Sequence, residues 1–331
     1  MTGIQRFSDE LCKSLIKTGN EVIVLAPKKI RPEYKLDCKI ERFGVFRGVL
    51  WEHLCLLFFL IKRKKPLLLN FGSPGPLFYK NRIVTIHDIS FKHNPAWFAW
   101  YYSLYYRLIT PIFAKRSKKI ITVSEFSKSE IQKWLKIPDS KFIIIHNVVS
   151  DSLLNAKDTE NPVKNSKYFL TVSSLDPRKN LRSIFKAFEE LKPENTELVL
   201  ACGKSSMFNF KDDVNSNIKS IGYVSDDELA SLYKNATAFI YLSLYEGFGI
   251  PPLEAMSFGC PVILSDIPVF REIYDDAAIF VKPDDISAIK NVINSVLNDE
   301  RLRNKLIRKG YEKAEEFSWD GESEVVVNVL K

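Results

Sequence analysis

Histidine and cysteine are scarce in this chain of 331 residues, with four and five copies respectively. No two cysteines are separated by only two residues, so the spacing typical of structural zinc sites is absent. The cysteines are also scattered and odd in number, which argues against a disulfide framework. We therefore interpret them as reduced thiols in apolar surroundings, as expected of a cytoplasmic protein.

Two further signatures are missing. No Gly-x-Gly-x-x-Gly sequence occurs, which argues against a dinucleotide-dependent oxidoreductase. The net charge of +8 is spread along the chain and forms no basic helix or aromatic–basic stripe of the common nucleic-acid-binding modules. These absences leave phosphorylated ligands or an anionic membrane surface as the partners that the positive charge would suit.

One apolar stretch, residues 54–61, is followed directly by the four cations Lys62–Lys65. A membrane-spanning helix needs about 20 apolar residues, so this stretch is too short to cross a bilayer. It is either a buried helix that ends in cations, which suit a helix C-terminus, or a surface that rests on anionic lipid. The second interpretation predicts peripheral contact with an anionic membrane surface.

The remaining pattern is that of an α/β protein. Short runs rich in valine, isoleucine, leucine and phenylalanine alternate with longer helical patterns, and most are unbroken rather than alternating. Strands of parallel sheets that are buried on both faces have this composition, and their alternation with helices predicts doubly wound sheets. The predicted strands are Glu21–Pro27, Leu67–Phe71, Arg82–His87, Lys119–Ser124, Phe142–Asn147, Tyr168–Ser174, Glu197–Gly203, Ala238–Ser243, Pro261–Asp266 and Ala277–Pro283.

A polar segment, Asn155–Lys167, separates the two series of strands and has the composition of a linker. We predict two Rossmann-like domains that face each other across a cleft, at residues 1–150 and 167–312, joined by a linker at 151–166. Residues 313–331 are expected to form a helix that packs back on the first domain. Because ligands of such sheets bind at the carboxyl ends of the strands, each domain offers one substrate site.

The first domain is predicted to lack a strand. The chain opens with Met-Thr-Gly-Ile-Gln-Arg-Phe and continues into an amphipathic helix predicted at Ser8–Thr18, with no strand before it. A Rossmann domain normally begins with its central strand. We therefore expect that the true start lies upstream and that a strand of about ten residues is missing. A stop codon just before Met1, with no strand-like codons, would contradict this expectation.

The most informative segment runs from Tyr241 to Pro261 and contains a glycine-rich turn between a predicted strand and a helix that restarts near Pro251. The backbone N–H groups of Phe248, Gly249 and Ile250 would form an anion site at the helix N-terminus. Glu246 would bind sugar hydroxyls and Glu254 ribose hydroxyls. Spacing alone equally allows two unrelated glutamates, one of which favours the helix dipole.

Two other strand ends carry charged or polar groups. Arg178 and Lys179 stand before a predicted helix, where cations oppose the helix dipole, and a bound diphosphate would offset that cost. The alternative is that Arg178 and Lys179 are two solvated charges without a ligand. His87 follows a buried strand and would point into the cleft, or it caps that strand and bonds to its own loop.

Together these segments resemble the retaining GT-B glycosyltransferases of family 4, over nearly the whole chain. The matching pieces stand in family order: Thr2–Phe7, Ile86–Asp88, Ile121–Lys128, Leu175–Asn180, Gly222–Ser225, the pair Glu246 and Glu254 with seven residues between them, and Phe317–Trp319.

The resemblance implies a role for each candidate residue. Arg178 and Lys179 would bind the donor diphosphate together with Gly3, whose loop closes over the phosphates. Glu254 would bind the ribose, and Glu246 and His87 would act at the donor sugar. The N–H groups of Phe248, Gly249 and Ile250 would hold sugar and phosphate. Family members often carry Arg or Gly at Ser173 or Ser174 and two adjacent glycines in the first loop, where this chain has the single Gly3.

The resemblance also implies the reaction. A hexose would pass with retention from a nucleotide-diphosphate sugar to a glycan hydroxyl, by a front-face route or by double displacement through Glu246, without cofactor or metal. The acceptor would be a polyprenyl-linked glycan of bacterial surface polysaccharide, such as lipopolysaccharide O-antigen or capsule, and mannose is one possible sugar. The aromatic segment Trp97–Arg107 is either a core stripe or an apolar lip for that acceptor. The alternatives are a nucleotide-sugar epimerase and an inactive donor-binding homologue.

Overall fold

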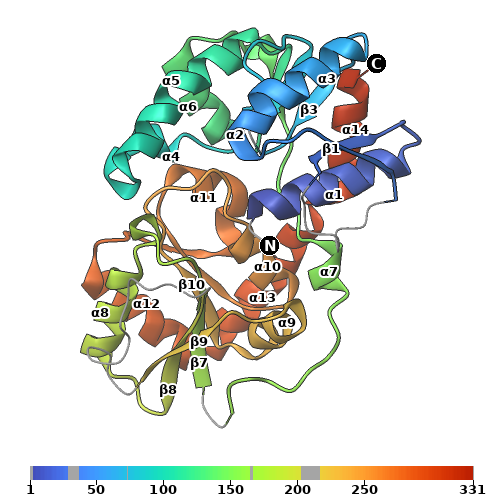
Figure 1. The fold of residues 1–331 in the computed structure, drawn as a ribbon. Coiled ribbons are helices and arrows are strands. Elements are labelled where there is room, and N and C mark those ends of the chain that lie inside the picture. The colour runs from blue at the N-terminus through green and yellow to red at the C-terminus, as the bar shows by residue number, and fades with distance from the viewer. Residues whose placement is uncertain (1–2, 29–36, 73, 165–166, 203–216, 331) are drawn as a thin grey trace. The chain divides into compact units, whose positions relative to one another are not determined.

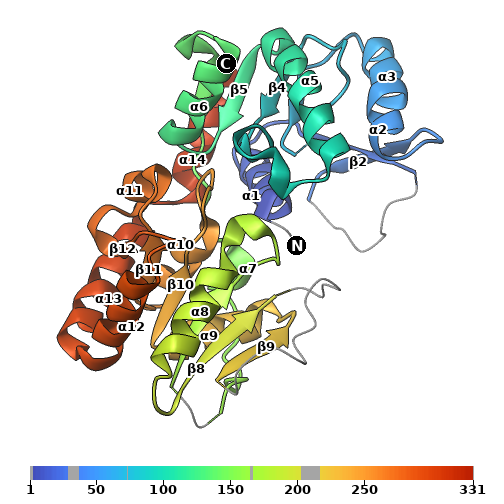
Figure 2. The same ribbon diagram turned by 90° about the vertical axis from the view of Figure 1, so that its left-hand side faces the viewer.

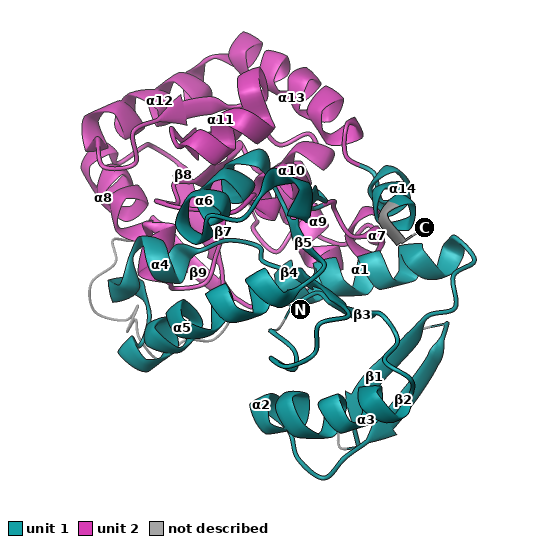
Figure 3. Cartoon of the chain, turned by 90° about the horizontal axis from the view of Figure 1, so that it is seen from above, with its two compact units in different colours: residues 1–147, 318–331 teal, residues 148–317 magenta. Residues whose placement is uncertain are grey.

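The structure is a computed structural model and describes residues 3–28, 37–72, 74–164, 167–202 and 217–330. The chain divides into two compact units, unit 1 with residues 1–147 and 318–331 and unit 2 with residues 148–317 (Figure 3). Thr2, Gly203 and the last two residues of the predicted linker lie outside the described residues.

Unit 1 contains two parallel sheets and helices that connect their strands (Figure 1). One sheet has the strand order β3-β4-β5-β6, and the other pairs β1 with β2. Its elements are α1 (Gly3–Lys17), β1 (Ile23–Pro27), β2 (Lys39–Phe43), α2 (Gly48–Leu50), the π-helix η1 (Trp51–Leu56), α3 (Leu57–Lys62), β3 (Leu68–Asn70), β4 (Arg82–Thr85), α4 (Ser90–His93), η2 (Pro95–Trp97), α5 (Trp100–Arg116), β5 (Lys119–Thr122), α6 (Glu125–Leu135), η3 (Asp139–Lys141), β6 (Phe142–Ile144) and α14 (Trp319–Leu330).

Helix α14 belongs to unit 1 although it ends the chain, because it packs against α1 (Figures 1 and 3). Ser14 of α1 donates a hydrogen bond to the Trp319 carbonyl at 3.1 Å, and the Trp319 ring contacts Phe7 with the centroids 6.0 Å apart. Glu322 accepts hydrogen bonds from the backbone N–H and ring Nδ1 of His146 at 3.0 and 2.9 Å. The chain therefore returns to the first unit at Ser318.

Unit 2 is one parallel sheet of six strands in the order β12-β11-β10-β7-β8-β9. Helices α8 and α12 pack together over one face, while α10 contacts α9 and α13 (Figure 2). Its elements are α7 (Asp151–Leu154), β7 (Lys167–Val172), η4 (Pro177–Lys179), α8 (Leu181–Leu191), β8 (Thr196–Ala201), β9 (Ile218–Gly222), α9 (Asp226–Asn235), β10 (Ala238–Tyr241), α10 (Ile250–Ser257), β11 (Val262–Ser265), α11 (Pro268–Tyr274), η5 (Asp275–Ala277), β12 (Ile279–Val281), α12 (Ile286–Asn298) and α13 (Glu300–Glu315).

The predicted linker is held along unit 2. The backbone N–H of Lys157 donates to Asp227 at 2.8 Å, and the hydroxyl of Thr159 donates to the Asp227 carbonyl at 3.2 Å. Lys234 of α9 pairs with Asp158. Residues 155–164, which contain neither helix nor strand, therefore run beside α9 as part of unit 2.

The prediction for the start of α1 was wrong. The helix begins at Gly3 and not at Ser8, because no helix-breaking residue follows Gly3 and Ser8 bonds inside the helix, donating to the Ile4 carbonyl at 2.8 Å. Gly3 is therefore the first helical residue rather than part of a loop. Each of the ten predicted strands overlaps an observed one, and the structure adds β2 and β9.

Candidate functional site

The candidate site of unit 2 lies where two neighbouring strands end. Strands β7 and β10 are paired in parallel at the centre of the sheet, so their carboxyl ends share one edge. Arg178 and Lys179 follow β7 in the short helix η4, and Glu246 follows β10. The topology thus brings together residues that lie far apart in the sequence, at the place where open α/β sheets bind ligands.

These three side chains form a compact charged cluster. Arg178 Nη1 donates to Glu246 Oε2 at 3.0 Å and to the Tyr245 carbonyl at 3.1 Å, and Lys179 Nζ donates to Glu246 Oε1 at 2.6 Å. The hydroxyl of Tyr241 also donates to Glu246 Oε1 at 3.1 Å. Each carboxylate oxygen therefore faces one cation in a region where Glu246 is only 7% exposed.

The cluster holds Glu246 ionised. Burial alone raises the pKa of this carboxyl, but the charges of Lys179 and Arg178 outweigh it and lower the pKa to about 2. For Lys179, burial lowers the ammonium pKa, and the charge of Glu246 more than compensates, so that the pKa is raised. At neutral pH the cluster thus carries two positive charges and one negative charge, a net positive charge that suits an anionic ligand.

We expect acid to weaken unit 2 through Glu246. The folded pKa of about 2 lies below the ordinary value of 4.5, so the unfolded chain binds more protons between these values. The stabilisation is present above pH 4.5 and is lost as the pH falls toward 2. Urea unfolding at about pH 6 and about pH 3.5 should show an acid loss in the free energy of unfolding that is about 1.4 kcal/mol larger for the wild type than for Glu246→Gln. An equal acid loss in the variant would contradict this assignment.

The turn between β10 and α10 depends on Gly249. Its φ of 92° lies in the left-handed region, and a Cβ atom there would approach Phe270 Cε1 to 2.6 Å. Helix α10 then begins at Ile250 with Pro251 and Pro252 in its first turn, where no N–H donor is needed. This local sequence sets the backbone of residues 248–250 at the start of the helix.

Glu254, inside α10, is 6% exposed and has a partner that sequence reasoning did not identify. The hydroxyl of Tyr233, on α9, donates to Glu254 Oε2 at 3.0 Å. Burial raises the pKa of this tyrosine, and the charge of Glu254 adds to the effect, so Tyr233 keeps its proton as a donor. Tyr241 was also missed as a partner of Glu246. No local pattern marks either tyrosine, because both read as core aromatics.

His87 and Gly3 belong to unit 1. His87 follows β4, and its Nε2 donates to the Phe71 carbonyl at 3.0 Å, because a carbonyl can only accept. The ring packs edge-on against Phe7, with centroids 4.9 Å apart. Burial lowers the pKa of His87, so at neutral pH the ring is uncharged with its Nδ1 lone pair available as an acceptor. Gly3 is exposed at the start of α1.

The chain resembles known proteins both in sequence and in fold. The family "Glycosyltransferase Family 4" matches residues 1–153, and "Glycosyl transferases group 1" matches residues 155–313. The O-antigen chain mannosyltransferase RfbU of Salmonella typhimurium is 34% identical over 257 residues, which cover 74% of this chain and 70% of the relative. The O-antigen chain mannosyltransferase B of Escherichia coli is 30% identical over 279 residues, covering 78% and 73%.

Among solved structures, WaaG, a glycosyltransferase involved in lipopolysaccharide biosynthesis, superposes with a TM-score of 0.76 at 16% identity, over 99% of this chain and 96% of that one. The fold is therefore GT-B, with parallel sheets and connecting helices in both units. The sequence relatives identify the family as well as the fold. Two of them are at least 30% identical to this chain, and the aligned residues cover more than two thirds of each relative. The chain belongs to the family 4 glycosyltransferases.

Proposed function

We propose that the chain transfers mannose, with retention, from a nucleotide-diphosphate sugar to a hydroxyl of a polyprenyl-linked glycan in O-antigen synthesis. The observation that supports this most is the buried cluster of Arg178, Lys179 and Glu246 at the carboxyl ends of β7 and β10. Two cations beside one carboxylate suit a ligand with a diphosphate next to a hydroxyl-rich ring. The O-antigen mannosyltransferases among the relatives support the sugar and the pathway.

In this proposal each site residue has one task. Arg178 and Lys179 bind the diphosphate, Gly3 lies close to the phosphates, and Glu254 accepts hydrogen bonds from the ribose. The N–H groups of Phe248, Gly249 and Ile250 hold sugar and phosphate. Glu246 and His87 contact the donor sugar, and the Nδ1 lone pair of His87 accepts a hydrogen bond from a sugar hydroxyl.

The proposed step is a front-face substitution. The bond between the anomeric carbon and the phosphate oxygen breaks, the acceptor oxygen bonds to that carbon from the same face, and its proton passes to the leaving diphosphate. Arg178 and Lys179 stabilise the negative charge that grows on the diphosphate. Double displacement through Glu246 is the rival route. Its carboxylate oxygens accept hydrogen bonds from two cations, which weakens the carboxylate as a nucleophile. A glycosyl adduct on Glu246 in intact-protein mass spectrometry would support the rival.

We propose that no metal ion takes part, since the two cations offer the charge that a divalent ion would supply. Turnover should therefore persist in the presence of excess chelator.

The relatives are named as transferases, which does not favour the alternatives of an epimerase or an inactive homologue. Incubation of the protein with a panel of nucleotide sugars and a polyprenyl-diphosphate-linked glycan tests the whole proposal. We expect transfer from a mannose donor, and transfer from none of the donors would contradict it.

Tyr233→Phe should separate binding from chemistry. The change removes only the hydroxyl that donates to Glu254, so a buried carboxylate loses one charge-assisted hydrogen bond. Because Glu254 binds the ribose in our proposal, we expect KM for the donor to rise about tenfold with kcat changed by less than about twofold. Tyr223→Phe, at an exposed position of the same unit, is the control. A fall in kcat with unchanged KM would refute this role.

We also propose that unit 1 rests on an anionic membrane. Residues 48–62 form successive turns of helix whose exposed side includes Phe58, 64% exposed, and α5 exposes Trp100 at 77%. We call the following exposed residues the apolar–basic face: Leu50, Leu54, Phe58, Ile61, Lys62, Arg63, Lys64, Lys65, Trp100, Leu104, Leu108 and Ile112.

The apolar–basic face combines the two features by which peripheral proteins bind lipid, an apolar helical surface and a cluster of cations. None of the described helices is long and apolar enough to cross a bilayer. A lipid-linked acceptor would be reached from such a position without insertion of the chain. This supports the lipid-linked acceptor over a free sugar acceptor.

The double variant Leu54→Glu, Phe58→Glu tests the membrane proposal. It places two negative charges on the apolar–basic face, and we expect sedimentation with phosphatidylglycerol vesicles to fall at least about tenfold. Tyr223→Glu adds a charge at another exposed aromatic and should leave vesicle binding unchanged. Wild-type protein that binds neutral phosphatidylcholine vesicles equally well, or a double variant that binds as wild type does, would contradict the proposal.

A further inference from the structure

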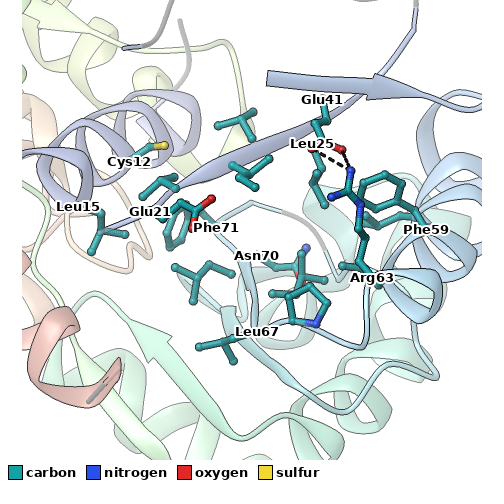
Figure 4. Close-up of a pocket in the computed structure, with 18 of the residues that line it drawn as sticks. Cys12, Leu15, Glu21, Leu25, Glu41, Phe59, Arg63, Leu67, Asn70 and Phe71 are labelled. Carbon is teal, nitrogen blue, oxygen red and sulfur yellow. Dashed lines mark hydrogen bonds and ion pairs between the residues drawn. The ribbon is translucent and has the colours of Figure 1, made fainter. Parts of the chain in front are cut away.

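The two units differ in how the space beside their strands is filled. In unit 1, a cavity of about 710 Å³ is lined by residues 21–25 and 67–71 (Figure 4). In unit 2, two fully buried aromatic residues of α11, Phe270 and Tyr274, fill the space behind the turn that joins β10 to α10. Helix α11 thus supports the turn of the candidate site from inside the protein.

Gly249 of this turn is held from two sides by one face of α11. Phe270 and Tyr274 are four residues apart, so their side chains project from the same face of the helix. The Phe270 ring lies where a side chain of residue 249 would stand, since a Cβ atom there would come within 2.6 Å of Phe270 Cε1. The hydroxyl of Tyr274 donates a hydrogen bond to the Gly249 carbonyl. The two rings also contact each other edge to face, with centroids 5.9 Å apart.

The backbone of Gly249 needs this support because glycine has little conformational preference of its own. Its φ of 92° and ψ of 72° are one choice among many that glycine can adopt. As the N-cap residue of α10, Gly249 has no side chain that could accept a hydrogen bond from the first turn. Pro251 and Pro252, which follow in that turn, have no N–H group. The orientation of the backbone at residues 248–250 therefore depends on contacts from outside α10.

The hydrogen bond to the Gly249 carbonyl also sets the direction of the Ile250 N–H group. The two groups belong to one peptide unit, which is planar and trans, so the N–H points opposite to the carbonyl. Because the carbonyl oxygen faces the Tyr274 hydroxyl, the N–H of Ile250 points away from it. A rotation of this peptide unit would redirect the N–H and break the hydrogen bond at the same time. The hydroxyl thus couples a buried contact to one of the three N–H groups of the candidate site.

The Tyr274 side chain is suited to this task. Burial raises the pKa of its hydroxyl well above the usual value, and the nearby Tyr241 and Glu246 add to the effect, so the hydroxyl stays protonated as a donor. Its ring also contacts the ring of Phe248 edge to face, with centroids 6.5 Å apart. One side chain therefore touches two successive residues of the turn, Phe248 by packing and Gly249 by a directed hydrogen bond.

We propose that Tyr274 is a positioning residue whose hydroxyl fixes the peptide unit between Gly249 and Ile250, so that the N–H groups of the turn face the diphosphate of the donor. Tyr274 is fully buried and acts through the backbone of the turn. The inference rests on the proposed function, which gives these N–H groups their ligand. It adds the side chain that orients them.

Tyr274→Phe tests the proposal, because it removes the hydroxyl and keeps the ring. Tyr168→Phe is the matched control. Tyr168 is 1% exposed and its hydroxyl donates to the Leu232 carbonyl at 2.8 Å, but it lies near the start of β7, at the opposite end of that strand from the candidate site. Both variants lose one buried hydrogen bond to a backbone carbonyl, so a merely structural role predicts the same behaviour for both.

Two quantities are measured for the wild type and both variants. Amide hydrogen exchange at residues 247–250 is followed in the free proteins, and the Kd values of GDP, UDP and ADP are determined by titration calorimetry. For Tyr274→Phe we expect exchange at the turn to accelerate at least about tenfold. We expect the Kd of the nucleoside diphosphate that binds the wild type to rise about five- to tenfold, because a smaller fraction of the turn is in the binding orientation. Tyr168→Phe should match the wild type in both.

The possible outcomes separate this role from the proposed function. Unchanged exchange at the turn or an unchanged Kd in Tyr274→Phe would overturn the role of Tyr274 and leave the donor site in place. Exchange that accelerates equally in β7 and β10 would report a general loss of stability and would also overturn it. Wild-type protein that binds none of the three nucleoside diphosphates would refute the donor site, and the role of Tyr274 with it.

Discussion

Replacing Glu246 by glutamine will lower kcat by at least about 100-fold without unfolding unit 2. Glutamine keeps the shape of the side chain and its contact with Tyr241, but it removes the negative charge that faces Arg178 and Lys179. In our proposal that charge lies beside the donor sugar and stabilises the positive charge that develops on it. Loss of one preorganised electrostatic contact of this kind typically costs 10²- to 10³-fold, as an order of magnitude.

The same variant should not weaken donor binding. Without Glu246, both cations remain available to the diphosphate, so we expect KM for the nucleotide sugar to be unchanged or lower. Glu312→Gln, on the exposed surface of α13, is the matched control and should leave both constants unaltered. Steady-state kinetics with a melting curve for each variant provides the measurement. A variant that retains more than about a tenth of wild-type kcat would rule out this role for Glu246.

The sequence was most informative where strands are buried on both faces. Runs such as Phe169–Val172 and Val262–Ser265 are apolar except for one hydroxyl side chain each, and the structure places each of them in a parallel sheet. The two strands that were not predicted are different in composition. β2 and β9, with the sequences Lys-Ile-Glu-Arg-Phe and Ile-Lys-Ser-Ile-Gly, lie at sheet edges and expose charged side chains. Edge strands lack the continuous apolar signal of central ones.

Local sequence also predicts only part of the candidate site. The glycine-rich turn, Glu246, and the pair Arg178 and Lys179 could be found from local pattern, because each conflicts with ordinary strand or helix composition. That all three meet in one cluster follows from the pairing of β7 with β10, which no local pattern specifies. Tyr233 and Tyr241 could not be found in this way, since a buried tyrosine has the same sequence signal whether its hydroxyl faces a core or a carboxylate.

Arg82 is the residue of unit 1 whose loss should destabilise the fold most. It is fully buried at the start of β4, and no carboxylate among the described residues pairs with it. Its guanidinium donates instead to the carbonyls of Pro74 at 3.1 Å and Pro76 at 2.7 Å, and to the Ser117 hydroxyl at 3.2 Å. Burial lowers the pKa of Arg82 to about 10, and it stays charged at neutral pH.

Arg82→Met will lower the free energy of unfolding of unit 1 by about 3–5 kcal/mol. Methionine fills much of the volume, but the carbonyls of Pro74 and Pro76 lose their donor and stay buried, which costs about 1–3 kcal/mol each. For a unit of this size, Tm should fall by roughly 10 °C in differential scanning calorimetry. Arg107→Met removes an exposed arginine from α5 and should change Tm by less than about 2 °C. Because the guanidinium bonds to the loop before β4, Arg82→Lys should recover only part of the loss. If Arg82→Met has the same Tm as the wild type, these hydrogen bonds contribute no net stability and the loop before β4 is held by packing alone.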